Sequence, residues 1–292
     1  MIKLLKPDYK VEEVYLLCLS NYEDADKKQR LTDCKDFVVK ASNDYEQYAK
    51  TNSLNYFIPV KVTKQNKNDK IINDLVSVEE LNDVYTNKFA AKGSPGRHIY
   101  DKIKTIAKLG TCPLCCHRDV TQLDHYLPKA NHPLLSVTPI NLVPSCSDCN
   151  KIKLANSPSK KEEETIHPYY DDLENSVWLN ANVIQSTPPT IVYSVIKPLE
   201  WDDTLFKRVQ YHFEILQLND LYSVQAAKEL VEINHSISEK FGEGGSEAVK
   251  KYLSGEAISR SKTNKNSWKA ALYTVISKDD WYCSEGFQHQ VQ

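Results

Sequence analysis

Two pairs of cysteines offer the clearest chemistry in this sequence. Cys112 and Cys115 form one Cys-x-x-Cys pair, and Cys146 and Cys149 form a second pair after 30 intervening residues. This is the typical ligand spacing of a tetrahedral zinc site, in which each sulfur lies about 2.3 Å from the ion. Two redox-active pairs are the alternative, but no strand–helix–strand pattern surrounds them. The spacing therefore predicts a structural zinc ion bound by four thiolates.

The residues between and after these pairs carry more information than the pairs themselves. Asp124 and His125 stand side by side in a short β-like run, Asn141 precedes the second pair, and Asn150 follows it directly. In this order, and over residues 110–155, the sequence resembles the HNH endonucleases. That resemblance implies a ββα-metal fold, in which zinc knuckles join a β-hairpin to a helix. One departure is Cys116, a position where the first knuckle often carries glycine to allow a left-handed turn.

The resemblance also implies a reaction, the hydrolysis of a phosphodiester bond, and the residue types suit it. An imidazole with a pKa of about 6.5 accepts a proton readily at neutral pH, so His125 is the predicted general base. By resemblance, Asn141 has an orienting, structural role beside it. Asp124 and Asn150 offer a carboxylate and an amide oxygen, which are hard ligands that suit a catalytic Mg²⁺ or Mn²⁺.

The chain is nearly neutral as a whole but contains a basic segment. Across all 292 residues, 37 basic side chains face 39 acidic ones, so the net charge of −2 gives no general sign of nucleic-acid binding. Residues 101–161, however, contain nine basic and four acidic side chains. Such a basic module is what sequence-independent phosphate binding requires. Lys129, Lys151 and Lys153 are the predicted nucleic-acid contacts.

Helical signals precede the cysteine cluster. Ser77 and Glu80 form a capping-box signature at the start of one helix. Ser94 and Pro95 predict the N-cap and first turn of the next helix, which Gly110 ends. The cluster is therefore expected to follow directly on a helix.

Alternating apolar residues predict short strands at 177–184 and 190–197, and helical periodicity returns from Trp201. Glycines at 242, 244 and 245 predict a break in that helical region. The predicted fold class is α+β, with a ββα-metal core embedded in mainly helical N- and C-terminal regions and a short β segment near 177–197. The predicted domains are a helical region at 1–92, a nuclease module at 93–165 and a mixed C-terminal region at 166–292.

Composition limits the class of protein. With 41% hydrophobic and 26% charged residues, the chain has the make-up of a globular domain rather than of a disordered or collagen-like one. No window approaches the roughly 18–20 apolar residues that span a bilayer, and the first residues lack the apolar stretch of a secretory signal. We therefore expect a cytoplasmic protein that has no membrane partner.

These observations favour a metal-dependent HNH endonuclease that acts on nucleic acid, with DNA as the favoured substrate. The layout is similar to that of HNH nucleases in bacterial antiphage systems of the Septu and retron-associated types, which implies an ATPase partner in a defence complex. Two alternatives stay open. One is a zinc-knuckle module that binds nucleic acid or protein without cutting it, and the other is a stand-alone restriction or homing nuclease.

Overall fold

The computed structural model describes residues 1–60, 70–153 and 157–289, which form two compact units, Met1–Asp172 and Leu173–Gln292. Within these ranges, helices combine with three small two-stranded sheets, which agrees with the predicted α+β class. The finer division into 1–92, 93–165 and 166–292 stays a prediction. Among the described residues, no helix is both long enough and apolar enough to cross a membrane.

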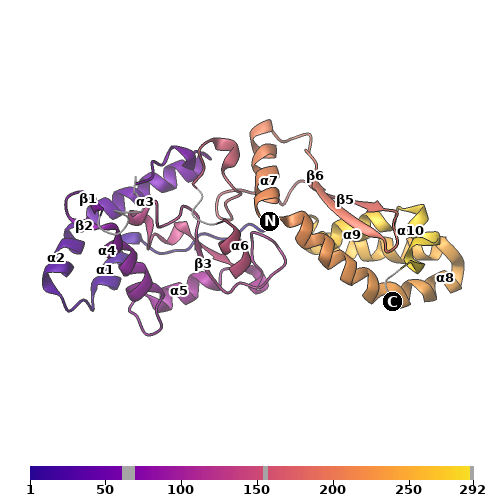
Figure 1. Cartoon of the computed structure of the whole chain (residues 1–292), viewed down its shortest axis with the longest axis horizontal. Coiled ribbons are helices and arrows are strands. Elements are labelled where there is room, and N and C mark those ends of the chain that lie inside the picture. Colours follow the sequence, from indigo (N-terminus) through magenta and orange to yellow (C-terminus); the bar gives the residue numbers. More distant parts are fainter. Residues whose placement is uncertain (61–69, 154–156, 290–292) are drawn as a thin grey trace. The chain divides into compact units, whose positions relative to one another are not determined.

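The N-terminal unit is built of short elements (Figure 1). Its helices are α1 (Val11–Leu19), α2 (Ala25–Asp33), α3 (Lys35–Lys50), α4 (Val78–Asp83), α5 (Arg97–Lys104) and α6 (Ser147–Lys153). Its strands are β1 (Ile71–Ile72), β2 (Val76–Ser77), β3 (Gln122–His125) and β4 (Leu142–Ser145). A π-helical segment, η2 (Val84–Ala90), continues α4. Short 3₁₀ turns lie at Leu54–Tyr56, Lys108–Gly110, Pro133–Leu135, Pro139–Asn141 and Lys161–Glu163.

The helix that leads toward the cysteine cluster begins later than the sequence predicts. The capping box at Ser77 is present, with both reciprocal hydrogen bonds to Glu80. The helix α5, however, takes Gly96 as its N-cap in place of Ser94. A Cβ atom at position 96 would lie 2.6 Å from the ring of Phe89, so only glycine lets the chain pass this close to η2. Close packing against η2 therefore sets the start of α5.

One hydrophobic core joins the N-terminal helices to the β3–β4 hairpin. Its buried side chains include Tyr15 from α1, Phe89 from η2, Ile103 from α5, Leu123 from β3 and Leu142 from β4. Burying such side chains stabilises the unit by about 1.5–3 kcal/mol each. The strand that carries Asp124 and His125 is therefore fixed by helices that come from the first hundred residues.

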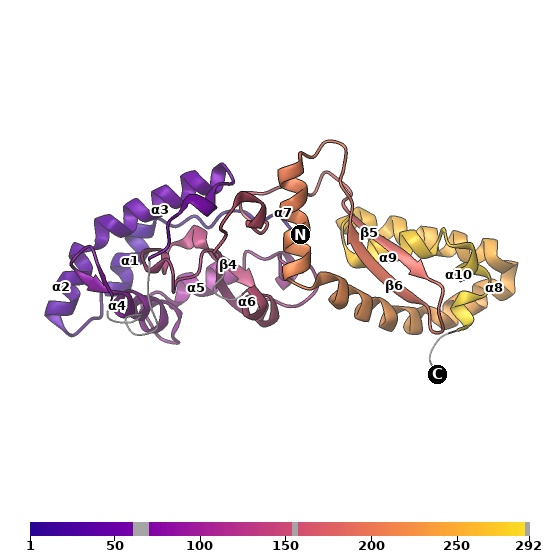
Figure 2. The same cartoon turned by 45° about the horizontal axis from the view of Figure 1, so that its top comes forward.

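The C-terminal unit packs a hairpin on helices (Figure 2). Its elements are β5 (Leu179–Ile184), β6 (Thr190–Val195), α7 (Asp203–Ile215), α8 (Leu218–Asn264), α9 (Trp268–Ile276), α10 (Asp280–Ser284) and a 3₁₀ turn at Gly286–Gln288. The two strands pair antiparallel, which confirms the predicted β segment. The backbone of α8 leaves the helical region at Gly244 and Gly245, which confirms the predicted break and divides α8 into two arms.

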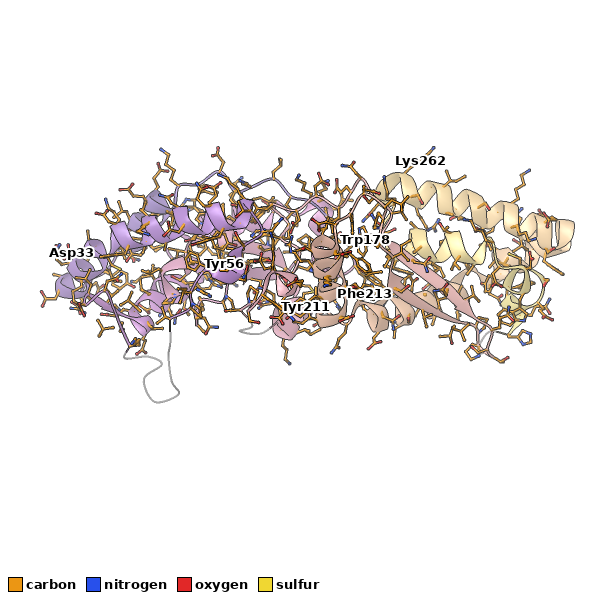
Figure 3. The ribbon with its side chains drawn as sticks, turned by 90° about the horizontal axis from the view of Figure 1, so that it is seen from above. Asp33, Tyr56, Trp178, Tyr211, Phe213 and Lys262 are labelled. Carbon is orange, nitrogen blue, oxygen red and sulfur yellow. The ribbon has the colours of Figure 1, made fainter. Side chains whose placement is uncertain are left out.

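Aromatic side chains form much of the interior of this unit. Trp178, labelled in Figure 3, is fully buried at the start of the hairpin. Its backbone N–H donates to Asn266 Oδ1 at 2.9 Å. The ring of Tyr222 lies edge-on to Tyr193, with centroids 5.5 Å apart, and to Phe213, with centroids 6.3 Å apart. Such pairs add about 0.5–1.5 kcal/mol each to the gain from area burial.

Candidate functional site

The four predicted cysteine ligands meet in space. The sulfur atoms of Cys112, Cys115, Cys146 and Cys149 all lie within 4.8 Å of one another, and all four residues are buried. A tetrahedral zinc site with bonds of about 2.3 Å has sulfur–sulfur edges of about 3.8 Å, so this cluster has the right size. Hydrogen bonding among the four thiols lowers the pKa of Cys115 and Cys146 and raises the pKa of Cys112 and Cys149, so two of the four sulfurs favour the thiolate form. The cluster can therefore hold a structural metal such as zinc.

Each cysteine pair forms a turn whose backbone N–H groups point at sulfur. The N–H of Arg118 approaches the Cys115 sulfur at 3.5 Å, and the N–H of Cys149 approaches the Cys146 sulfur at 3.4 Å. The guanidinium of Arg118 also reaches Asp148 at 2.9 Å, which links the first turn to α6. Cys116 adopts the left-handed conformation at φ +52°, so a non-glycine residue makes the turn that glycine usually makes.

The cysteine cluster joins the β3–β4 hairpin to α6. The strands β3 and β4 pair antiparallel, with Asp124 opposite Val143 and His125 opposite Leu142. The helix α6 starts at Ser147, between the two cysteines of the second pair. A metal held by the four sulfurs would therefore fix the position of α6, which carries Asn150, relative to the strand that carries the Asp–His pair.

The imidazole of His125 is held on two sides. Its Nε2 lies 2.8 Å from the backbone carbonyl of Ser136, and because a carbonyl can only accept, Nε2 carries the proton and Nδ1 is the basic nitrogen. The ring of Tyr85, from η2, meets the imidazole edge-on with centroids 4.4 Å apart. Burial lowers the pKa of His125 to about 3, although its hydrogen bond to Ser136 acts in the opposite direction. The ring is therefore neutral at pH 7.

Asn141 contacts the backbone of the loop between β3 and β4. Its side chain is fully buried and exchanges two hydrogen bonds with the backbone of Leu127, at 2.8 and 3.0 Å. It also lies 3.4 Å from the carbonyl of Leu135. These bonds close the loop between β3 and β4, and the carbonyl that contacts the imidazole belongs to Ser136 in that loop. A part for Asn141 in catalysis stays a prediction.

Asp124 pairs with Lys153, a residue that the sequence predicts as a nucleic-acid contact. The ammonium of Lys153, at the end of α6, lies 2.9 Å from Asp124 Oδ2 and 2.7 Å from the carbonyl of His125. Both side chains are almost fully buried, at 7% exposure for Lys153 and 8% for Asp124. Burial raises the pKa of Asp124 more than Lys153 lowers it. Lys153, predicted to contact nucleic acid, is therefore inside the protein because a buried carboxylate needs a cation.

The remaining predicted residues lie closer to the surface. Asn150 is half-buried in α6, one turn before Lys153 and so on the same side of that helix. Lys151 is exposed. The ammonium of Lys129 lies 3.4 Å from the Thr86 hydroxyl. Contact of Lys129 and Lys151 with nucleic acid stays a prediction.

Three features of the site escaped the sequence analysis. These are the Ser136 carbonyl on His125, the ring of Tyr85 against it, and the ion pair between Lys153 and Asp124. The Ser136 carbonyl is a backbone group, so no residue type in the sequence indicates its contact with His125. Tyr85 lies 40 positions before His125, in the π-helical segment η2. A π-helical segment is often found at a functional site.

The chain is similar to a protein of a bacteriophage. The chain is 30% identical over 224 residues to Protein ea31 of Escherichia phage lambda, and the match covers 72% of this chain and 75% of that protein. No family model matches the sequence, and no solved structure matches it.

Proposed function

We propose that this chain, which belongs to the family of phage lambda Protein ea31, is a metal-dependent endonuclease of the HNH type. One observation carries the proposal. The Asp124–His125 pair on β3 and Asn150 on α6 belong to one hairpin–helix unit, and the cysteine cluster lies at the junction of its parts. Structural zinc at such a junction would serve catalysis by fixing the distance between strand and helix.

His125 is the group that would accept the proton of the attacking water. Because Nε2–H donates to the Ser136 carbonyl, Nδ1 is the nitrogen available to accept. The ring of Tyr85 packs against the imidazole and limits its rotation. The low pKa of His125 keeps the base unprotonated at neutral pH in the free protein, and a phosphate nearby would raise that pKa toward the working range.

Asp124 and Asn150 are the residues that would hold Mg²⁺ or Mn²⁺. The ammonium of Lys153 on Asp124 Oδ2 supports this, because it is a cation standing where the carboxylate can accept one. A bound divalent ion supplies stabilisation of the negative charge on the phosphate and on the leaving oxygen. Lys129 and Lys151 would bind neighbouring phosphates. DNA as the substrate, an ATPase partner and a role in antiphage defence stay proposals from the sequence resemblance.

The alternative function is a zinc module that binds nucleic acid or protein without cutting. The burial of the Asp–His pair favours it, since Asp124 is 6% and His125 is 9% exposed. The two functions differ in what His125 does. In the binding module it is a packed core residue, whereas in the nuclease it is needed only for the chemical step.

The test is cleavage of plasmid and single-stranded DNA by the zinc-loaded chain, with Mg²⁺, Mn²⁺ or EDTA. We expect cation-dependent cutting by the wild type and a loss of at least 100-fold in His125→Ala, in line with the loss of a general base. His98→Ala is the matched control, because His98 is an exposed histidine in α5 of the same unit. Equal cutting by wild type and His125→Ala would exclude the mechanism, and equal DNA binding without cutting would favour the binding module.

A further inference from the structure

We infer that Lys153 is a built-in competitor of the catalytic cation: it neutralises Asp124 in the free protein, and a divalent ion binds only by displacing it. This inference rests on the proposed function, because it concerns the same carboxylate. It assigns to Lys153 a positioning role that neither its sequence position nor its residue type suggests.

The ammonium of Lys153 is bound in a site, not merely near a charge. It lies 2.9 Å from Asp124 Oδ2 and 2.7 Å from the carbonyl oxygen of His125, and 5.3 Å from the centre of the Tyr126 ring. A carboxylate, a carbonyl and an aromatic face are three groups that attract a cation. With 7% of the Lys153 side chain exposed, water hydrates its ammonium only weakly. The chain itself therefore provides a cation site beside Asp124.

A divalent ion and this ammonium cannot share the site. Mg²⁺ binds carboxylate oxygen at about 2.0–2.1 Å, well inside the space that the ammonium takes. Two cations a few ångströms apart repel strongly where burial limits screening by water and salt. One carboxylate also carries only one negative charge. Binding of the metal to Asp124 must therefore release the Lys153 ammonium.

Lys153 is well placed to be released. Its flexible four-carbon stem can carry the ammonium away from Asp124 without moving α6. Once released, it becomes a free cation one turn from Asn150, on the helix that carries one of the two proposed metal ligands. The sequence prediction that Lys153 contacts nucleic acid would then describe the metal-loaded protein, and the buried pair would describe the free protein.

The first test uses the wild-type protein and the accessibility of its lysines. Zinc-loaded protein is treated briefly with acetic anhydride, with and without Mn²⁺, and the acetylation of each lysine is measured by mass spectrometry. We expect labelling of Lys153 to rise at least tenfold at saturating Mn²⁺. Lys151, which is exposed on the same helix, is the internal control and should change by less than twofold. Labelling of Lys153 that stays low while Mn²⁺ is bound would overturn the inference.

The second test measures Mn²⁺ affinity by titration calorimetry in the wild type, Lys153→Met and Lys153→Arg. We expect at least tenfold tighter binding in Lys153→Met, affinity near that of the wild type in Lys153→Arg, which keeps the cation, and no binding in Asp124→Asn. Equal affinity in the wild type and Lys153→Met would overturn the competition but leave the metal site intact. Absence of binding in both would overturn the proposed metal site and the inference with it. Zinc content verifies that each variant is folded. If Lys153→Met does not fold, the acetylation of Lys153 in the wild type decides whether the metal displaces the ammonium.

Discussion

Each unit of the protein buries a carboxylate beside a lysine, and the two carboxylates behave in opposite ways. Asp124 pairs with Lys153 at 2.9 Å in the N-terminal unit, and Glu229 pairs with Lys269 at 2.7 Å in the C-terminal unit. Both acidic side chains are 8% exposed. The pKa of Asp124 is nevertheless raised, by burial, whereas the pKa of Glu229 is lowered although burial acts to raise it.

The difference lies in the donors that surround each acid. Glu229 also accepts from the hydroxyl of Tyr273 at 2.8 Å and lies 3.7 Å from the guanidinium of Arg260. These donors join α9 and the two arms of α8, so the C-terminal unit itself satisfies its acid. Asp124 has the ammonium of Lys153, which is itself buried, and the backbone N–H of His125, and together these lower its pKa less than burial raises it. We conclude that Glu229 holds helices together, whereas Asp124 is left with capacity for a ligand.

The largest effect is expected from a change that disrupts the metal site of the N-terminal unit and leaves the C-terminal unit intact. Cys149→Ser removes one of the four clustered sulfurs, and a structural zinc site contributes on the order of 10 kcal/mol to folding. We expect loss of bound zinc and unfolding of the N-terminal unit. All four tryptophans lie at positions 178, 201, 268 and 281, so tryptophan fluorescence reports the C-terminal unit alone and should keep its unfolding transition.

The matched control for this change is Cys116→Ser. Cys116 adjoins the same knuckle but is not one of the four clustered cysteines, and its thiol points to the Pro113 carbonyl at 3.7 Å. We expect one zinc ion per chain in this variant, measured by atomic emission. Equal zinc loss in the two variants would mean that Cys116 takes part in binding the metal.

The second prediction removes the lysine from each buried pair. Lys153→Met leaves Asp124 buried without its partner, which should cost about 3–5 kcal/mol. Lys269→Met should cost about 1 kcal/mol, because Glu229 keeps Tyr273 and Arg260 as partners. Urea unfolding measures both effects, followed by zinc release for the N-terminal unit and by tryptophan fluorescence for the C-terminal unit. Equal losses of unfolding free energy in the two variants would contradict the proposed difference between Asp124 and Glu229.

The ion pair between Asp124 and Lys153 also shows which contacts the sequence does not predict. The cysteine cluster, the capping box at Ser77 and the strands of the C-terminal hairpin follow from local spacing and alternation, and the structure contains all of them. The ion pair between Asp124 and Lys153 joins residues 29 positions apart and depends on how α6 docks on β3. The start of α5 at Arg97 depends in the same way on contact between Gly96 and Phe89. Contacts of this kind have no local signature.

The third prediction uses pH to probe the satisfied acid. The pKa of Glu229 is lower in the folded unit than its usual value of about 4.3, so the folded state favours the charged form. Its contribution to stability is therefore complete above that usual value and is lost as the pH falls through the lowered pKa. We expect the urea midpoint of the tryptophan signal to fall between pH 6 and pH 3 more steeply in the wild type than in Glu229→Gln. Parallel profiles would show that the ion cluster contributes nothing through its charge.

The smallest expected effect concerns backbone strain at one exposed position in each unit. Leu109 has φ +53° and is 97% exposed, and Gln217 has φ +52° at the junction of α7 and α8. The left-handed conformation costs a non-glycine residue about 1 kcal/mol. Leu109→Gly and Gln217→Gly should therefore each stabilise their own unit by about that amount, since little packing is lost. Zinc release and tryptophan fluorescence in urea measure the two gains separately. A stability loss in Leu109→Gly alone would show that this apolar side chain packs against something in solution, and would place an interaction surface on the turn that enters the cysteine cluster.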